Sequence, residues 1–343
     1  MRIGSGNDFL GQGELAAGRE TEKVMPKRKK AGRGKWNKQA VCGLIFALLP
    51  LIGFLIFNGF PLVISFLALF CDVDLYNPGS FTWNNFEGFK VIFLNEYSLS
   101  SYGLNMAHYF YKACGITLWV ASAQFVSLLI ALVVSVLLAT KVKGHKVFQV
   151  LFFVPYICST VAVSLMWRWI FSGEPSGVLN TILGTSRKWL NDPATMTWTI
   201  IVAVIWQAPG YGIVMYKAAL ANIDNTHYEA ASLDGANAWQ KFIYVTLPEI
   251  SPTTFYLLIA GIGAGLLTYD MAALMIPDGF LGDIGGTESM GLTLVRLVYY
   301  LIKNDRLAPS VVSAASVITW VLFIVIGSVT LALFRRRDKS MEG

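Results

Sequence analysis

Apolar positions gather into six long runs that polar segments separate. Apart from Asp270, which interrupts the fifth, the runs contain no charged residue. Each is long enough to cross the roughly 30 Å hydrocarbon core of a bilayer as a helix. Continuous apolar runs also argue against a barrel, whose short strands would alternate apolar and polar positions. The runs are Val41 to Cys71, Ala113 to Thr140, Val147 to Trp167, Pro193 to Tyr216, Ile250 to Pro277 and Leu307 to Phe334.

The pattern therefore predicts an all-α membrane protein with six transmembrane helices. Composition agrees, because 55% of the residues are hydrophobic and 14% are charged, whereas about a quarter are charged in soluble domains. We expect one six-span domain over 41–335, between a disordered basic tail at 1–40 and a short cytoplasmic tail at 336–343. The spans are expected at about 43–70, 113–139, 147–171, 194–219, 253–277 and 307–334.

The basic residues predict the orientation of these spans. Of the 27 Lys and Arg residues, 19 fall on the side that holds both chain ends and 8 on the other side. Because short basic loops stay inside the cell, we expect a multi-pass protein of the plasma or inner membrane with both termini cytoplasmic. The net charge of +6 resides in the first forty residues. A basic segment beside a span suits anionic membrane lipid, so we expect lipid contact and no nucleic-acid partner.

The segment 221–252 is too rich in helix signals to be a plain connector. Thr226 and Glu229 have the spacing of a capping box, which predicts a helix starting there. Gly235 then supplies the permissive backbone of a tight turn. We expect a second short helix over about 237–244, ended by the prolines at 248 and 252. The product would be a helix-turn-helix at the cytoplasmic surface.

The same segment carries a spaced motif: Glu-Ala-Ala, three residues, Gly, nine residues, an apolar residue, one residue and Leu-Pro. With it, the chain resembles the six-span permease subunits of binding-protein-dependent ABC importers, whose signature has Ile where this chain has Val. The match covers the first span to the last. The segments LFFVPYICSTVAVSLMWRWIF and QKFIYVTLPEISPT look like the maltose-type, carbohydrate-importing branch. The motif residues are Glu229, Ala230, Ala231, Gly235, Val245, Leu247 and Pro248.

The resemblance implies the type I ABC importer permease fold, in which this loop is a coupling helix seated in a groove of a cytoplasmic ATPase. It also implies a homologous second permease subunit, two ATP-binding subunits and an external solute-binding protein as partners. The expected function is inward transport of a sugar or oligosaccharide. A polyol, sugar-phosphate or polyamine substrate stays open, because these importers share the loop motif.

The sequence contains no Gly, four residues, Gly-Lys-Ser/Thr run, which is the phosphate-binding loop of many ATPases. We therefore expect no enzymatic activity, no cofactor and no metal in this chain, with ATP and magnesium bound by the partner ATPase. The three histidines are scattered over separate loops, which disfavours a membrane enzyme. A secondary transporter for a small polar solute is the alternative, although Asp270 is the single carboxylate expected within a span.

The fourth span contains QAPGYG near its middle, where Pro209 should break the helix. Backbone groups freed at membrane depth must be buried in protein or face a wet cavity. We therefore consider a solute path beside the break. The alternative is a packing kink in which a neighbouring helix satisfies Gln207. The candidate path residues are Trp206, Gln207, Tyr211, Tyr269 and Asp270.

The outer loops leave two questions open. The loop 72–112 contains Trp83, Phe86 and Phe89, enough aromatic surface for a small cap or short helix, but a plain connector is the alternative. Cys71 and Cys114 both fall near the outer face, and sequence alone does not decide whether they pair.

Overall fold

The computed structural model describes residues 38–73, 81–94, 106–139, 144–174, 177–276, 291–303 and 310–342. Most of the predicted 1–40 tail and the first half of the third outer loop lie outside these residues. The chain divides into two units at Phe60. In the first unit, α1 (Lys38–Phe54) is followed by the π-helical turn η1 (Leu55–Gly59). The second unit contains the rest of the chain, including the 221–252 loop.

Together with α1 and η1, the helices after Gly59 account for the predicted spans. In chain order they are α2 (Phe60–Leu67), α4 (Met106–Ala139), α5 (His145–Ile157), α6 (Thr160–Ile170), α8 (Pro193–Gln207), α9 (Pro209–Ala221), α13 (Ser251–Leu266), α14 (Asp270–Met275) and α17 (Ser310–Glu342). Among the described residues, five stretches are long and apolar enough to cross a membrane: Cys42–Leu67, Met106–Ala139, Pro193–Ala221, Ser251–Met275 and Val311–Arg337. The bent pair α5 and α6 gives a sixth if it is counted as one span.

Three spans contain a break in the helix. The third, expected to be continuous over 147–171, bends by 100° between α5 and α6. Pro155 lies inside α5 and removes a backbone donor, and Cys158 and Ser159 then take extended ψ angles of 141° and 133°. The predicted break in the fourth span is present but slight, because only Ala208 separates α8 from α9. The fifth span is interrupted at 267–269, between α13 and α14.

The last span also corrects the predicted boundary of the C-terminal tail. We expected a tail from residue 336, but α17 continues to Glu342. The basic residues after Phe334 favour this extension, since cations are stabilised by the carbonyl end of a helix. The Arg337 guanidinium also lies over the Phe255 ring of α13, 4.8 Å from its centroid.

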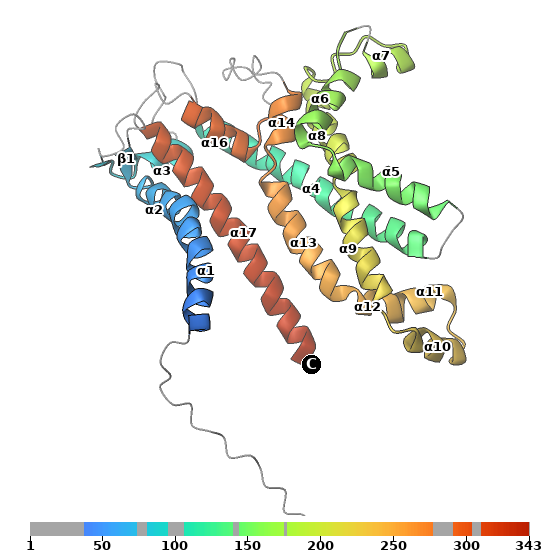
Figure 1. Cartoon of the computed structure of the whole chain (residues 1–343). Coiled ribbons are helices and arrows are strands. Elements are labelled where there is room, and N and C mark those ends of the chain that lie inside the picture. The colour runs from blue at the N-terminus through green and yellow to red at the C-terminus, as the bar shows by residue number, and fades with distance from the viewer. Residues whose placement is uncertain are drawn as a thin grey trace, which may run out of the picture. The chain divides into compact units, whose positions relative to one another are not determined.

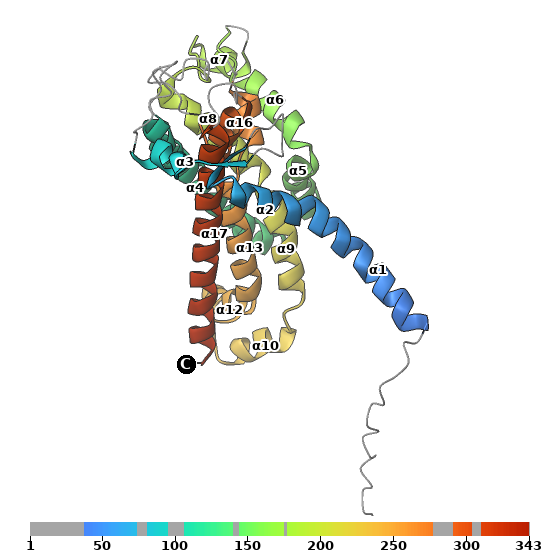
Figure 2. The same cartoon turned by 90° about the vertical axis from the view of Figure 1, so that its left-hand side faces the viewer.

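Helix α4 is the centre of the bundle, and it contacts α8, α9, α13 and α16. Three apolar clusters follow its length, the first around Tyr109 and Phe110, the second around Val120 and the third around Ala131. On one side α17, α13 and α9 run next to one another (Figures 1 and 2). Broken spans on a continuous central helix leave room for polar groups inside the bundle.

The described part of the 72–112 loop is a small folded cap. Strands β1 (Cys71–Val73) and β2 (Phe81–Trp83) pair antiparallel, and α3 (Glu87–Phe89) with the π-helical η2 (Lys90–Leu94) follows. Buried Asn84 donates to Ser313 Oγ of α17 at 2.9 Å. Phe70, Trp83, Phe86 and Phe89 form a cluster of ring contacts. The cap alternative is therefore confirmed for these residues, and Cys71 and Cys114 are both free.

After the cap, two further outer elements complete the fold. Helix α7 (Val178–Leu183) precedes the start of the fourth span, where Asp192 accepts a hydrogen bond from the Ala194 N–H and Pro193 begins α8. Helix α16 (Leu294–Lys303) is strongly amphipathic. Its apolar face packs on α4 and α17.

Because α13 approaches α4 closely, adding one methyl group to a glycine of α13 should destabilise the protein only where the two helices meet. A Cβ at Gly265 would lie 2.9 Å from the Ala121 Cα, whereas a Cβ at Gly263 would meet nothing within 4 Å. We expect Gly265→Ala to lower the free energy of unfolding by about 1–3 kcal/mol, since overpacking forces the helices apart. Gly263→Ala on the same helix is the matched control. Thermal unfolding of both variants in detergent measures the effect, and equal melting temperatures would contradict it.

Candidate functional site

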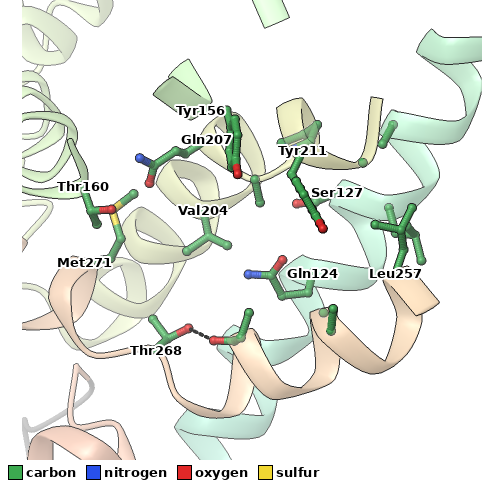
Figure 3. A pocket seen from close by; sticks show the side chains of 18 of the residues that line it. Gln124, Ser127, Tyr156, Thr160, Val204, Gln207, Tyr211, Leu257, Thr268 and Met271 are labelled. Carbon is green, nitrogen blue, oxygen red and sulfur yellow. Dashed lines mark hydrogen bonds between the residues drawn. The ribbon is translucent and has the colours of Figure 1, made fainter. Parts of the chain in front are cut away.

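A cavity of about 490 Å³ lies in the bundle between α4, the bent pair α5 and α6, the fourth span and the fifth span. Figure 3 shows side chains from all of these elements pointing toward it. Its apolar lining includes Leu128, Val204, Leu257 and Met271. Its polar lining consists of Gln124, Ser127, Tyr156, Thr160, Gln207, Tyr211, Thr268, Tyr269 and Asp270.

All three helix breaks border this central cavity. Tyr156 and Thr160 flank the bend of the third span, Ala208 is itself a lining residue, and the fifth-span break supplies residues 267–269. The bend frees the Cys158 carbonyl, and the Gln207 side-chain amide donates to it at 3.3 Å. The alternative in which a neighbouring helix satisfies Gln207 is therefore correct for the NH2 group of its side chain. Since Gln207 also lines the cavity, it can hold a break together and still face a solute.

Three tyrosines, Tyr156, Tyr211 and Tyr269, line the cavity. The Tyr211 and Tyr256 hydroxyls are 3.0 Å apart, which joins α9 to α13 by a hydrogen bond. The Tyr156 ring lies 5.8 Å from the Tyr211 ring. Gln124 extends from α4 toward the centre, as Figure 3 shows. Aromatic faces beside amide and hydroxyl groups are suited to a polar, uncharged solute that can both stack and form hydrogen bonds.

The structure brings four of the five predicted path residues together. Gln207, Tyr211, Tyr269 and Asp270 line the cavity, but Trp206 does not. The Trp206 ring instead contacts Trp167 of α6, at 5.8 Å between centroids, because adjacent positions on a helix face different directions.

Sequence reasoning missed several lining residues: Gln124, Ser127, Tyr156, Thr160 and Thr268. An amide inside an otherwise apolar run was the available signal for Gln124. Nothing in the sequence marked the rest, because their shared cavity depends on the bend of the third span.

Charge in the cavity is confined to one carboxylate. Asp270 is the first residue of α14 and is exposed to the cavity. Of the described residues that line this space, none is Lys or Arg. The lining therefore offers an anionic solute no countercharge, and Asp270 would repel it.

A second candidate site is the 221–252 loop, which lies at the same end of the bundle as the C-terminus (Figures 1 and 2). Its first helix, α10, covers Asn225–Leu233. Asp224, not Thr226, is the N-cap: its carboxylate accepts from the Thr226 N–H at 3.0 Å. The predicted capping box is wrong, since the earlier acid caps the helix first. Glu229 lies exposed in the second turn, outside the cap.

The Asp224 cap depends on the charged form of its carboxyl. The hydrogen bond from the Thr226 backbone holds the pKa of Asp224 below its usual range. Because the pKa is lowered in the folded protein, the carboxylate stabilises the helix at pH values above the ordinary pKa of Asp. This contribution is lost as the pH falls through the lowered value.

The second half of the loop is longer than predicted. Asn237 and Gln240 form a reciprocal capping box at the start of α11 (Ala238–Lys241). The π-helical turn η3 (Phe242–Thr246) then leads into α12 (Leu247–Glu249). Pro248 therefore does not end the helix, because the wider π turn before it accommodates its ring and missing N–H. Pro252 begins the fifth span, as predicted.

The two halves of the loop are held in a fixed turn. Gly235 has a φ of +78°, which a residue with a side chain rarely adopts. Lys241 donates to Ser232 Oγ across the turn at 2.7 Å, and the Tyr228 hydroxyl lies 2.9 Å from that of Thr246.

These contacts leave an apolar surface in the open. Leu233 is 90% exposed and Tyr244 is 76% exposed, and Trp239, Glu229 and Ala230 are also exposed. Val245 is half-buried. Exposed aromatic and aliphatic residues on ordered short helices are typical of a protein-binding surface.

Comparison with known proteins gives a family match over most of both sites. The profile of the "Binding-protein-dependent transport system inner membrane component" family matches residues 113–339. The "Probable ABC transporter permease protein YesP" of Bacillus subtilis is 30% identical over 306 residues, 87% of this chain and 91% of that protein. The "Arabinooligosaccharides transport system permease protein AraP" of Bacillus subtilis is 30% identical over 277 residues, 79% of this chain and 84% of that protein.

A solved structure has the same fold. A chain of a bacterial ABC transporter "involved in the import of the acidic polysaccharide alginate" is 24% identical and superposes with a TM-score of 0.67. The comparison covers 88% of this chain and 98% of that chain.

The turn at Gly235 predicts how the loop responds to substitution. We expect Gly235→Val to strain the backbone by about 1–2 kcal/mol and to raise tryptic cleavage after Lys241 about tenfold through local opening. Gly235→Asn should be milder, because Asn tolerates the left-handed region. Cleavage after the less exposed Lys217 of α9 serves as the internal control. Equal cleavage of the Val and Asn variants after Lys241 would show that the turn does not depend on glycine.

Proposed function

Because the chain belongs to the family of binding-protein-dependent transport system inner membrane components, we propose that it imports a sugar or oligosaccharide as one permease subunit of an ATP-driven transporter. Its fold is that of type I ABC importer permeases. One observation carries the proposal: the family match spans both the central cavity and the exposed 221–252 loop. The chain thus has a place for a solute and, separately, a surface for an energy-supplying partner.

The cavity favours a neutral sugar as the substrate. Relatives of this chain are named for transport of arabinooligosaccharides, of lactose and of multiple sugars. Tyrosine rings, amides and hydroxyls can bind sugar rings and their hydroxyl groups. The lone Asp270 and the lack of Lys and Arg in the described lining disfavour uronates and sugar phosphates. Polyols meet the same chemical requirements less well, because they lack a flat ring face for stacking.

The exposed loop surface suits an ATPase partner. Coupling would run through Glu229, Ala230, Ala231, Gly235, Val245, Leu247 and Pro248. Glu229 offers a charge, and the exposed Leu233, Trp239 and Tyr244 of the same loop add apolar area. We place ATP and magnesium on two separate ATP-binding subunits, so that hydrolysis occurs outside this chain.

The remaining partners would be a homologous second permease and an external solute-binding protein. The structurally similar transporter has also been solved "in complex with alginate pentasaccharide-bound periplasmic protein". In our proposal the end of the bundle with the 221–252 loop and the α17 C-terminus faces the cytoplasm (Figure 1). The positive residues at 335–337 support that orientation, and both termini would then be cytoplasmic.

The energy source is the direct test of this function. Uptake of a neutral sugar into vesicles that contain the assembled transporter should require internal ATP and survive a proton uncoupler. Thermal-shift screening of the external binding protein against neutral and acidic sugars would select the substrate. Uptake that collapses with the uncoupler and ignores ATP would establish the secondary-transporter alternative instead.

The polar residues that line the cavity should each contribute to the affinity for the substrate. Gln207→Ala and Tyr211→Phe should each raise the apparent KM for the sugar about threefold to tenfold, since each removes a hydrogen bond of about 0.5–1.5 kcal/mol. Trp206→Phe, which alters the neighbouring residue outside the cavity, is the control and should leave KM unchanged. If both cavity variants keep the parental KM and substrate preference, the solute does not use this face.

The corrected cap separates two roles of acidic residues in the loop. Glu229→Gln should reduce ATP-dependent uptake and ATPase co-purification about tenfold while the permease still assembles, because it removes a charge from the partner surface. Asp224→Asn keeps an acceptor for the cap and should be nearly silent. Asp224→Ala should loosen α10. Its uptake should fall less on acidification than that of the parent, because the variant has no carboxylate at this cap to protonate. Normal uptake in Glu229→Gln would remove Glu229 from the partner contact.

A further inference from the structure

The break in the fifth span is held from outside the cavity. Between α13 and α14, residues 267–269 leave the helical hydrogen-bond pattern. Carbonyl groups released at this depth need donors from elsewhere in the protein. The Thr268 carbonyl within the break, and the Ala272 and Ile276 carbonyls at the C-terminal end of α14, receive hydrogen bonds from one element, the start of α16.

Two side chains supply these bonds. The Thr293 hydroxyl donates to the Thr268 carbonyl at 2.9 Å. The Arg296 guanidinium donates through Nη1 to the Ala272 carbonyl at 2.7 Å and through Nη2 to the Ile276 carbonyl at 3.0 Å. Thr293 and Arg296 are 0% and 2% exposed. Arg296, which would be counted as an outer-loop base by sequence, is thus a buried donor at the carbonyl end of α14, where a cation is favoured.

The same face of α16 continues the contact. Thr293, Arg296 and Tyr299 are spaced by three residues and so lie along one side of the helix. The Tyr299 ring lies 5.3 Å from the ring of Tyr269, the residue directly before α14. α16 therefore contacts the fifth span both at its break and after it.

Helix α16 is itself fixed to the centre of the bundle. The Leu294 N–H donates to the Thr117 hydroxyl of α4 at 2.8 Å. Leu297 and Leu301 are buried in the first apolar cluster. The element that holds the break is consequently anchored to the unbroken central helix, independently of the cavity.

We propose that Thr293 and Arg296 form a clamp that positions the outer wall of the cavity, residues 268–271. In this arrangement α14 stays against α6, where the Ser164 hydroxyl meets the Met271 sulfur at 3.3 Å. Arg296 is a positioning residue: it does not line the cavity, but it fixes where Tyr269 and Asp270 stand. A guanidinium is suited to this task, because its planar fork reaches two carbonyls at once and a Lys ammonium does not.

Cysteine reactivity tests the clamp without any substrate. The full chain is placed in lipid nanodiscs with its four cysteines replaced by serine, and one reporter is introduced. The Ser164→Cys reporter lies on α6 against α14, and the Ser135→Cys reporter lies on α4. Both native serines are 0% exposed. The rate of modification by a water-soluble methanethiosulfonate is measured for each.

We expect Arg296→Gln to speed modification of the Ser164→Cys reporter about tenfold, because losing charged hydrogen bonds promotes local opening. The Ser135→Cys reporter should keep its parental rate. Arg296→Lys should fall between parent and Arg296→Gln. Lys303→Gln removes an exposed cation from the same helix and should change neither reporter.

A second pair of variants tests the other half of the clamp. Thr293→Val should speed the Ser164→Cys reporter about threefold, and Thr293→Ser, which keeps the hydroxyl, should restore the parental rate. An unchanged Ser164→Cys rate in Arg296→Gln would overturn the proposal. Equal acceleration of both reporters would also overturn it, since Arg296 would then support the whole bundle and not α14 in particular. Neither result depends on sugar import.

Discussion

Every backbone polar group at membrane depth needs a partner within the protein, and this requirement organises the whole bundle. The chain breaks three of its spans, at Cys158–Ser159, at Ala208 and at 267–269. The bend of the third span frees the Cys158 carbonyl, which Gln207 binds, and the break of the fifth span frees the Thr268 carbonyl, which Thr293 binds. All three breaks border one space, and Gln207 also lines that space and makes it polar, whereas Thr293 acts from outside it.

Close packing of small residues on α4 makes the breaks tolerable. The broken fourth span approaches α4 where a Cβ on Gly212 would lie 2.8 Å from the Ala131 Cβ, and the fifth does so at Gly265 against Ala121. Without bulky side chains between them, these backbones come close enough for dispersion contacts to compensate for lost helix hydrogen bonds. The unbroken helix is thus the rigid reference for both broken spans.

The cavity and the 221–252 loop are joined by continuous helix. α9 begins at Pro209 in the cavity wall and ends at Ala221, shortly before α10. α13 begins directly after the loop and reaches the cavity through Leu257 and Gly261. A displacement of the loop would therefore move Tyr211 on one wall and Gly261 on another. Rigid secondary elements of this kind are a physical route for coupling two distant sites.

The sequence determined the features that depend on local pattern. Runs of apolar residues set the number and approximate ends of the spans, and Gly235 set the turn of the loop, because only its permissive backbone suits a φ of +78°. The break near Pro209 was readable because a proline disrupts a helix locally. Four residues of the cavity followed from the chemistry of the fourth and fifth spans.

Only the tertiary structure decided which groups meet. Competition between two nearby acceptors made Asp224 the cap of α10, although Thr226 and Glu229 have the right spacing. The 100° bend of the third span brought Tyr156 and Thr160 into the cavity, and no local pattern foretold it. Arg296 looks like any outer-loop base in the sequence. Its burial among carbonyls that lie 20 and 24 residues earlier in the chain depends on how α16 packs, and contacts over that separation leave no periodic signal in the chain.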